Sequence, residues 1–139
     1  MVHALSEIHR VLAPGGTLID MRPLVNRWPV EVVSGRGSKE TGRADDMLDQ
    51  LNADRASNDA MREAESRGWF RRETEEFFPF FYTWDTPKEM EEFIAEEWTD
   101  FAELGEEVKK ATRSAWAIGD ADSQVRVRVN VLISRWKKL

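Results

Sequence analysis

The first two elements are marked by a change in the spacing of apolar residues. Between residues 3 and 12 apolar side chains recur at helical spacing, which predicts a short amphipathic helix. These positions are Leu5, Ile8, Val11 and Leu12. A Pro-Gly-Gly turn at 14–16 ends the helix, and the apolar run at 17–21 predicts a buried strand directly after it.

Proline and glycine interrupt the pattern from Arg22 to Arg43, and we predict a long exposed loop over 22–43. The interrupting residues are Pro23, Pro29, Gly35, Gly37 and Gly42. The stretch is also locally basic, with Arg22, Arg27, Arg36, Lys39 and Arg43. Long loops in compact domains are commonly functional or disordered, and a solvated mobile loop is the interpretation we favour.

Two longer segments follow. Residues 43–67 lack proline and glycine and carry a weak apolar stripe, which predicts one long helix or two short ones before Gly68. The aromatic segment 69–84 predicts one or two strands, with Pro79 at a sheet edge or bulge. Its last aromatic residues are Phe77, Phe78, Phe80, Phe81, Tyr82 and Trp84. We interpret them as core, with a stacking platform for a flat ligand or nucleic acid as the alternative.

The last third of the chain predicts two helices and a strand. Asp85 or Thr86 is a typical N-cap before Pro87, and a second helix is expected from about Asp100 to Ile118. Over 124–136 apolar and mostly polar residues alternate, which predicts an antiparallel strand. Its predicted core face carries Val125, Val127, Val129, Val131 and Ile133. For Arg126 and Arg128 on the other face, a solvated surface, a cover for acidic helices and a basic stripe with Lys137 and Lys138 all remain open.

Composition narrows the class of protein. The chain has 139 residues, 41% of them hydrophobic and 33% charged, which predicts one globular domain over 1–139. It has no cysteine, which excludes disulfides, zinc–cysteine sites and a thiol nucleophile. The net charge of −6 disfavours binding to nucleic acid or an anionic membrane, and no apolar run is long enough to span a bilayer. We therefore expect a cytoplasmic protein that binds neither nucleic acid nor a membrane.

Polar side chains form few catalytic groupings. His3 and His9 are six residues apart, on opposite faces of a helix, so they cannot share a metal ion and are expected on the surface. No serine lies in a G-x-S-x-G turn, which disfavours acyl-transfer hydrolysis. The acids Glu73, Glu75 and Glu76 could act as a base or bind cations, but a solvated strand face explains them better.

The segment from Ala4 to Ile19, ALSEIHRVLAPGGTLI, resembles a signature of class I S-adenosylmethionine-dependent methyltransferases. Its core is the E-x-x-R-V-L-x-P-G-G motif at Glu7–Gly16. In that family the signature covers the helix before the fifth strand, a turn, and the fifth strand. The resemblance implies an α/β, partial Rossmann-like methyltransferase fold, with a mixed sheet of about three strands in the family order 5-7-6, packed with helices.

The resemblance also implies that the family's cofactor-binding segments are missing from this sequence. The family binds its cofactor through a glycine-rich loop and two further segments upstream of the signature, and no G-x-G-x-G occurs here. We therefore expect a methyltransferase-related protein without the cofactor-binding half, which binds no cofactor alone and S-adenosylmethionine only when completed by a partner or an upstream segment. The family's acceptor region, the segment after the fifth strand, corresponds to Arg22, Arg27 and Trp28 as substrate-binding candidates.

The strand at Thr17–Met21 would lack its usual parallel neighbour, which leaves an apolar edge open to association. From this edge we expect a homodimer related by a two-fold axis, or a complex with a separate cofactor-binding chain. The alternative function is a non-catalytic dimerisation or interaction module.

Overall fold

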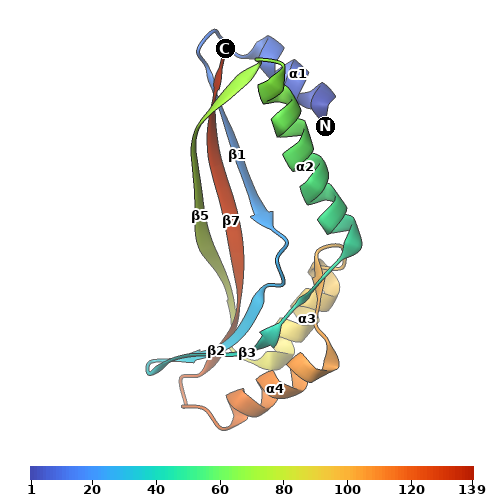
Figure 1. Ribbon diagram of the computed structural model, residues 1–139. Coiled ribbons are helices and arrows are strands. Elements are labelled where there is room, and N and C mark those ends of the chain that lie inside the picture. Colours follow the sequence, from blue (N-terminus) through green and yellow to red (C-terminus); the bar gives the residue numbers. More distant parts are fainter. The chain divides into compact units, whose positions relative to one another are not determined.

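The computed structural model describes residues 1–139 and has an α/β fold of four helices and a mostly antiparallel sheet (Figure 1). The helices are α1 (Val2–Val11), α2 (Leu48–Ser66), α3 (Pro87–Glu97) and α4 (Glu106–Ala117). The strands are β1 (Thr17–Leu24), β2 (Pro29–Ser34), β3 (Gly37–Arg43), β4 (Asp45–Asp46), β5 (Phe70–Trp84), β6 (Ala102–Glu103) and β7 (Gln124–Lys138). None of the helices is long and apolar enough to cross a membrane.

The main sheet is organised around β7. It has five strands rather than about three: the order is β1-β7-β2-β3, and β5 also pairs with β7. Strand β2 is antiparallel to both β3 and β7. The amide of Lys138 donates to the carbonyl of Gly16 and that of Leu139 to the carbonyl of Trp69, so the end of β7 lies beside the starts of β1 and β5. Both strands therefore run antiparallel to β7, as Figure 1 shows.

The residue contacts group the chain into two compact units. The first contains Met1–Leu24, Leu51–Phe78 and Val131–Leu139; the second contains Val25–Gln50 and Pro79–Asn130. Strands β5 and β7 each continue from one unit into the other.

The core of the first unit lies between one face of its sheet and helices α1 and α2. Its buried members are Leu5, Ala60, Met61, Ala64, Phe70 and Trp136. The small residues on α2 let that helix approach the strands closely, and Leu18 of β1 packs against the same cluster. The Pro-Gly-Gly turn works as expected, because Gly15 has a φ of 69°, which favours glycine over other residues.

The second unit is built on the hairpin of β2 and β3, against which α4 packs. Val30, Val125 and Val127 are fully buried in its core. Helix α3 begins at the predicted N-cap: Thr86 and Glu89 form a reciprocal capping box, with Pro87 in the first turn.

The long loop predicted over 22–43 is not present. This stretch contains the end of β1 and the hairpin of β2 and β3, which turns at Gly35 and Arg36 between the paired residues Ser34 and Gly37. The proline and glycine residues lie where strands tolerate them: Pro29 is the first residue of β2, and Gly42 faces the side chain of Val108 on α4. The prediction was wrong because proline and glycine at strand ends, and glycine at a close contact, produce the same sequence pattern as a loop.

Two predicted helices begin later than expected because short strands take their first residues. Helix α2 begins at Leu48 and α4 at Glu106. The preceding residues form β4 and β6, which pair antiparallel with each other, Asp45 opposite Glu103 and Asp46 opposite Ala102.

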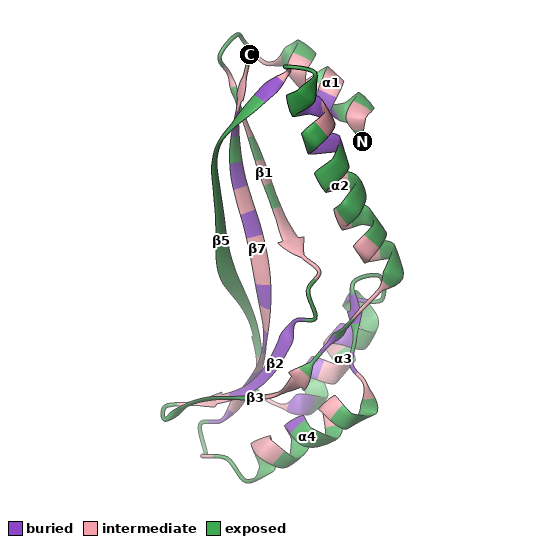
Figure 2. Ribbon diagram, in the orientation of Figure 1, coloured by how far each residue is buried: buried purple, intermediate pink, exposed green.

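The aromatic strand is confirmed, but most of its side chains do not form the predicted core; Tyr82 and Trp84, at its end, pack against Phe93 and Trp98. Every residue of β5 from Arg71 to Thr83 is exposed, and Figure 2 shows the strand green along nearly its whole length. Phe77 retains 56% of its accessible surface and Phe80 retains 49%. Strand β5 pairs only with β7, so it is an edge strand, as Pro79 predicted. The aromatic composition of β5 did not indicate that few other side chains would pack over it.

The alternation on β7 changes phase between the units. In the second unit the buried residues are Val125, Val127 and Val129, as predicted. In the first unit they are Leu132, Ser134 and Trp136, whereas Val131 and Ile133, predicted on the core face, are only half-buried. Because side chains alternate with a period of two, a shift of one residue exchanges the two faces of a strand.

Candidate functional site

The three predicted substrate residues do not belong to one compact unit. Arg22 lies near the end of β1 in the first unit, whereas Arg27 and Trp28 lie just before β2 in the second. Each is therefore described in its own surroundings.

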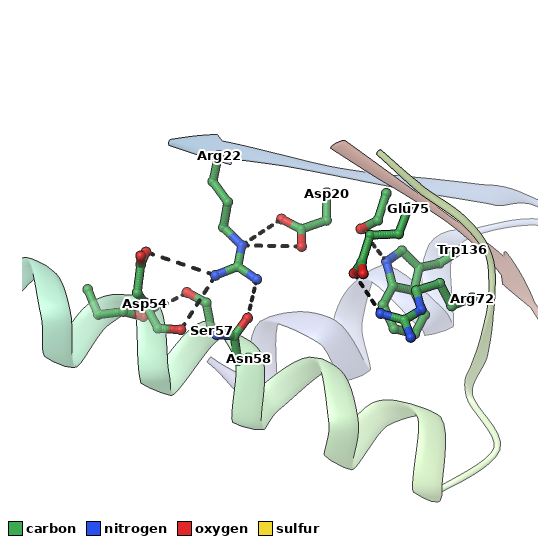
Figure 3. A network of polar contacts seen from close by, with 10 residues as sticks. Asp20, Arg22, Asp54, Ser57, Asn58, Arg72, Glu75 and Trp136 are labelled. Carbon is green, nitrogen blue, oxygen red and sulfur yellow. Dashed lines mark hydrogen bonds and ion pairs between the residues drawn. The ribbon is translucent and has the colours of Figure 1, made fainter. Parts of the chain in front are cut away.

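Arg22 is the centre of a polar network that joins β1 to α2 (Figure 3). Its Nη2 donates to Oδ1 of Asn58 at 2.6 Å, and its Nη1 lies 3.4 Å from the carbonyl oxygen of Asp54. On the other side, its Nε lies 3.3 Å from the carboxylate of Asp20, two residues away on the same face of β1. The side chains of Arg22, Asp20 and Asp54 are all largely shielded from water.

A hollow of about 270 Å³ lies beside this network, against the same face of the sheet. It is lined by Asp20, Arg22, Asn58, Met61, Arg62, Glu65, Arg72, Glu75, Leu132, Ser134 and Trp136. At its inner wall the indole Nε1 of Trp136 donates to the Ser134 hydroxyl at 2.8 Å. The guanidinium of Arg72 lies 5.7 Å from the centre of a Trp136 ring and donates to Glu75 at 2.6 Å.

The charges around this hollow balance, with three arginines and three carboxylates in its lining. Each arginine already has an acidic partner: Arg22 has Asp20, Arg72 has Glu75, and Arg62 has Asp59. No group of three or more histidine or acidic side chains in the protein is arranged to hold a metal ion. The network therefore fixes β1 against α2 and leaves no surplus charge for a ligand.

Arg27 and Trp28 have different surroundings. Arg27 has a φ of 55°, and its amide donates to Asp46 at 2.9 Å while its guanidinium pairs with Asp45 at 3.3 Å. Trp28 is only 3% exposed and packs edge-on against Trp98, with ring centres 5.2 Å apart. Trp28 is a core residue here, whereas Arg27 reaches the surface.

The histidines partly depart from the prediction. His3 is exposed, but His9 is half-buried, stacked on Trp69 and edge-on to Phe70, with ring centres 6.0 Å and 5.5 Å away. Its Nε2 is buried without a hydrogen-bond partner. His9 thus packs at the end of the α1 face instead of lying free on the surface.

A second polar site lies in the second unit, on the face of β7 opposite Val125 and Val127. The carboxylate of Glu31 accepts a hydrogen bond of 2.6 Å from Nε of Arg126 and lies 3.5 Å from Nε of Arg128. Glu31 is 6% exposed. The adjoining hollow, of about 310 Å³, is lined by Asn26, Pro29, Arg43, Pro79, Arg128 and Asn130. The alternation of Arg126, Arg128 and Asn130 was the sequence signal for this site, but it did not reveal the buried partner on β2.

One ionisable group with a shifted pKa lies outside both hollows. The hydrogen bond and charge of Glu91 raise the pKa of the Arg113 guanidinium on α4, so this side chain stays charged. It links α4 to α3 on the surface of the second unit.

No protein-family model, curated protein or solved structure matches this chain.

Proposed function

We propose that this chain is the part of a methyltransferase-like fold that follows the cofactor-binding half, and that it works only with such a half at the free edge of β1. The cofactor-binding half would be supplied by the same polypeptide or by another chain. The cofactor would then be S-adenosylmethionine, held by residues outside the sequence described here.

Two features of the first unit support the proposal. Strand β7 lies between β1 and β5 and runs antiparallel to both, which is the arrangement implied by the family order 5-7-6. The segment Ala4–Ile19, which contains the E-x-x-R-V-L-x-P-G-G motif, covers most of α1, the turn and the start of β1, and these correspond to the elements that the signature covers in the family.

The observation that carries the proposal is the exposure of β1. This strand ends the sheet and pairs only with β7, so the outer edge of Thr17–Met21 has no neighbouring strand. Ile19 and Met21 alternate with Leu18, which packs on the core, and with Asp20, and they are 52% and 63% exposed. An unpaired edge that also presents large apolar side chains is an association site unless something covers it. A neighbouring strand with its own helical layer would cover both the edge and this face.

The test measures cofactor binding and association together. Calorimetric titration with S-adenosylhomocysteine is expected to show no saturable binding by the folded chain alone. Binding is expected once a class I cofactor-binding half, truncated after its fourth strand, is added. Met21→Lys should weaken this gain, whereas Lys88→Gln, on an exposed part of α3, should not. Saturable micromolar binding by the chain alone would overturn the proposal, because it would place a complete cofactor site within these residues.

The same exposed edge also supports the alternative, a dimerisation module without cofactor chemistry. Light scattering on the same samples separates the two functions. A stable dimer that Met21→Lys dissociates, with no cofactor binding in any mixture, would favour the module. A chain that gains cofactor binding only with the added half would favour the methyltransferase.

A further inference from the structure

The hollow beside Arg128 differs from the one beside Arg22 in its charge. Two arginines and no acidic residue line it, in a chain whose net charge is −6. Glu31 contacts both Arg126 and Arg128, so one negative charge faces two positive charges. The shorter contact is with Arg126, and Arg43 is paired separately with Glu40 at 2.9 Å. The surplus positive charge therefore resides on Arg128.

Arg128 is also the arginine with unused hydrogen-bonding capacity. Its Nε is buried and has no hydrogen-bond partner, and its contact with Glu31 is too long to be a good hydrogen bond. The Arg128 side chain as a whole is 42% exposed, so its terminal N–H groups are accessible to an anionic ligand. The planar guanidinium fork matches a carboxylate in two-point geometry.

The walls of the hollow favour an anion with an apolar body. Pro29 and Pro79 line it with apolar rings, and Asn26 and Asn130 add amide groups that carry no charge. Further along the same face of β5, two residues from Pro79, the ring of Phe81 is 41% exposed and lies 4.3 Å below the guanidinium of Arg126. A volume of about 310 Å³ is at the lower end of the range for small-molecule sites.

The geometry points to a binding site for a small organic carboxylate, held by Arg128 through its carboxylate, with its apolar body against Pro29 and Pro79. The asparagine amides hydrogen-bond to the carboxylate or to polar substituents on the ligand. The site needs no cofactor and lies wholly within the second unit, so it holds whether or not the methyltransferase proposal is correct.

The experiment is a calorimetric titration of the whole chain with benzoate, compared with benzyl alcohol and inorganic phosphate. Benzoate is expected to bind saturably at one site and benzyl alcohol not to bind, because the neutral compound cannot satisfy Arg128. Arg128→Gln should weaken benzoate binding by about tenfold or more, as expected for the loss of a charge-assisted contact worth about 1.4 kcal/mol or more. Arg36→Gln is the matched control, since Arg36 is an exposed arginine of the same unit.

Asn130→Asp provides a second test that leaves every arginine in place. It adds a negative charge to the lining of the hollow and should likewise weaken benzoate binding, while circular dichroism and thermal unfolding show that both variants are folded. The proposal is overturned if benzoate does not bind, if Arg128→Gln and Arg36→Gln have equal effects, or if Asn130→Asp binds normally. Binding of phosphate without binding of benzoate would likewise overturn the assignment to a carboxylate.

Discussion

The Glu31 carboxylate on β2 accepts a hydrogen bond of 2.6 Å from Nε of Arg126 on β7, although the two residues are 95 positions apart in the sequence. The pair is well shielded from water, so neither charge is fully solvated in the folded protein. Removing one partner leaves the other charge poorly compensated. Loss of either partner should therefore destabilise the second unit.

Arg126→Leu is expected to lower the free energy of unfolding by about 1–3 kcal/mol, because Arg128 compensates Glu31 only partly. Urea unfolding followed by circular dichroism measures the change. The control is Arg36→Leu, which removes a largely exposed arginine and should change stability by less than about 0.5 kcal/mol. Equal losses for the two variants would contradict a special role for the Glu31 pair.

Thr86→Ala is expected to destabilise the second unit by about 1 kcal/mol. The threonine hydroxyl accepts a hydrogen bond from the amide of Glu89 at 3.2 Å, and the Glu89 carboxylate accepts one from the amide of Thr86. Thr86→Ser keeps the acceptor and should retain most of the stability. If alanine and serine behave alike in chemical denaturation, the capping box does not stabilise α3.

Gly42→Ala should destabilise the protein by about 1–3 kcal/mol through overpacking. A Cβ atom at position 42 would lie 2.8 Å from Cγ2 of Val108, so α4 would have to move away from β3. In a Val108→Ala background the same substitution should cost less, because the obstructing methyl groups are gone. Additive losses across this double-mutant cycle would show that the two residues do not interact.

Arg22→Lys is expected to lower stability by about 1–2 kcal/mol, although the charge is retained. A lysine cannot reach Asp20, the Asp54 carbonyl and Asn58 at once, as the guanidinium fork does. Arg62→Lys, on the exposed side of α2, is the matched control and should change stability by less than about 0.5 kcal/mol. Unfolding should be followed by near-ultraviolet circular dichroism, to which Trp69 and Trp136 of the first unit contribute. If Arg22→Lys is as stable as the control, the contacts between β1 and α2 do not depend on the several N–H donors of the Arg22 guanidinium.

The sequence by itself determined most elements whose pattern is local. The spacing of Leu5, Ile8 and Leu12 predicted α1, the Pro-Gly-Gly turn predicted the start of β1, and Thr86 with Pro87 predicted where α3 begins. Alternating valines predicted β7. These predictions succeed because helical periodicity, capping and turn conformation depend on residues a few positions apart.

Other features depend on contacts between residues far apart in the sequence, and only the tertiary structure decided them. The hairpin of β2 and β3 was hidden because Gly42 is required by Val108, 66 positions later, and not by a local turn. The exposure of Phe77 and Phe80 follows from the edge position of β5.

For the candidate sites, too, local sequence patterns predicted some features and tertiary contacts decided others. The family resemblance suggested Arg22, Arg27 and Trp28 as substrate-binding candidates; in the structure Trp28 is buried and Arg22 hydrogen-bonds to Asn58 on α2. The pairing of Arg126 with Glu31 could not be read from either segment alone. Local patterns determine which face of an element is apolar, whereas burial and charge pairing depend on which distant element is placed against that face.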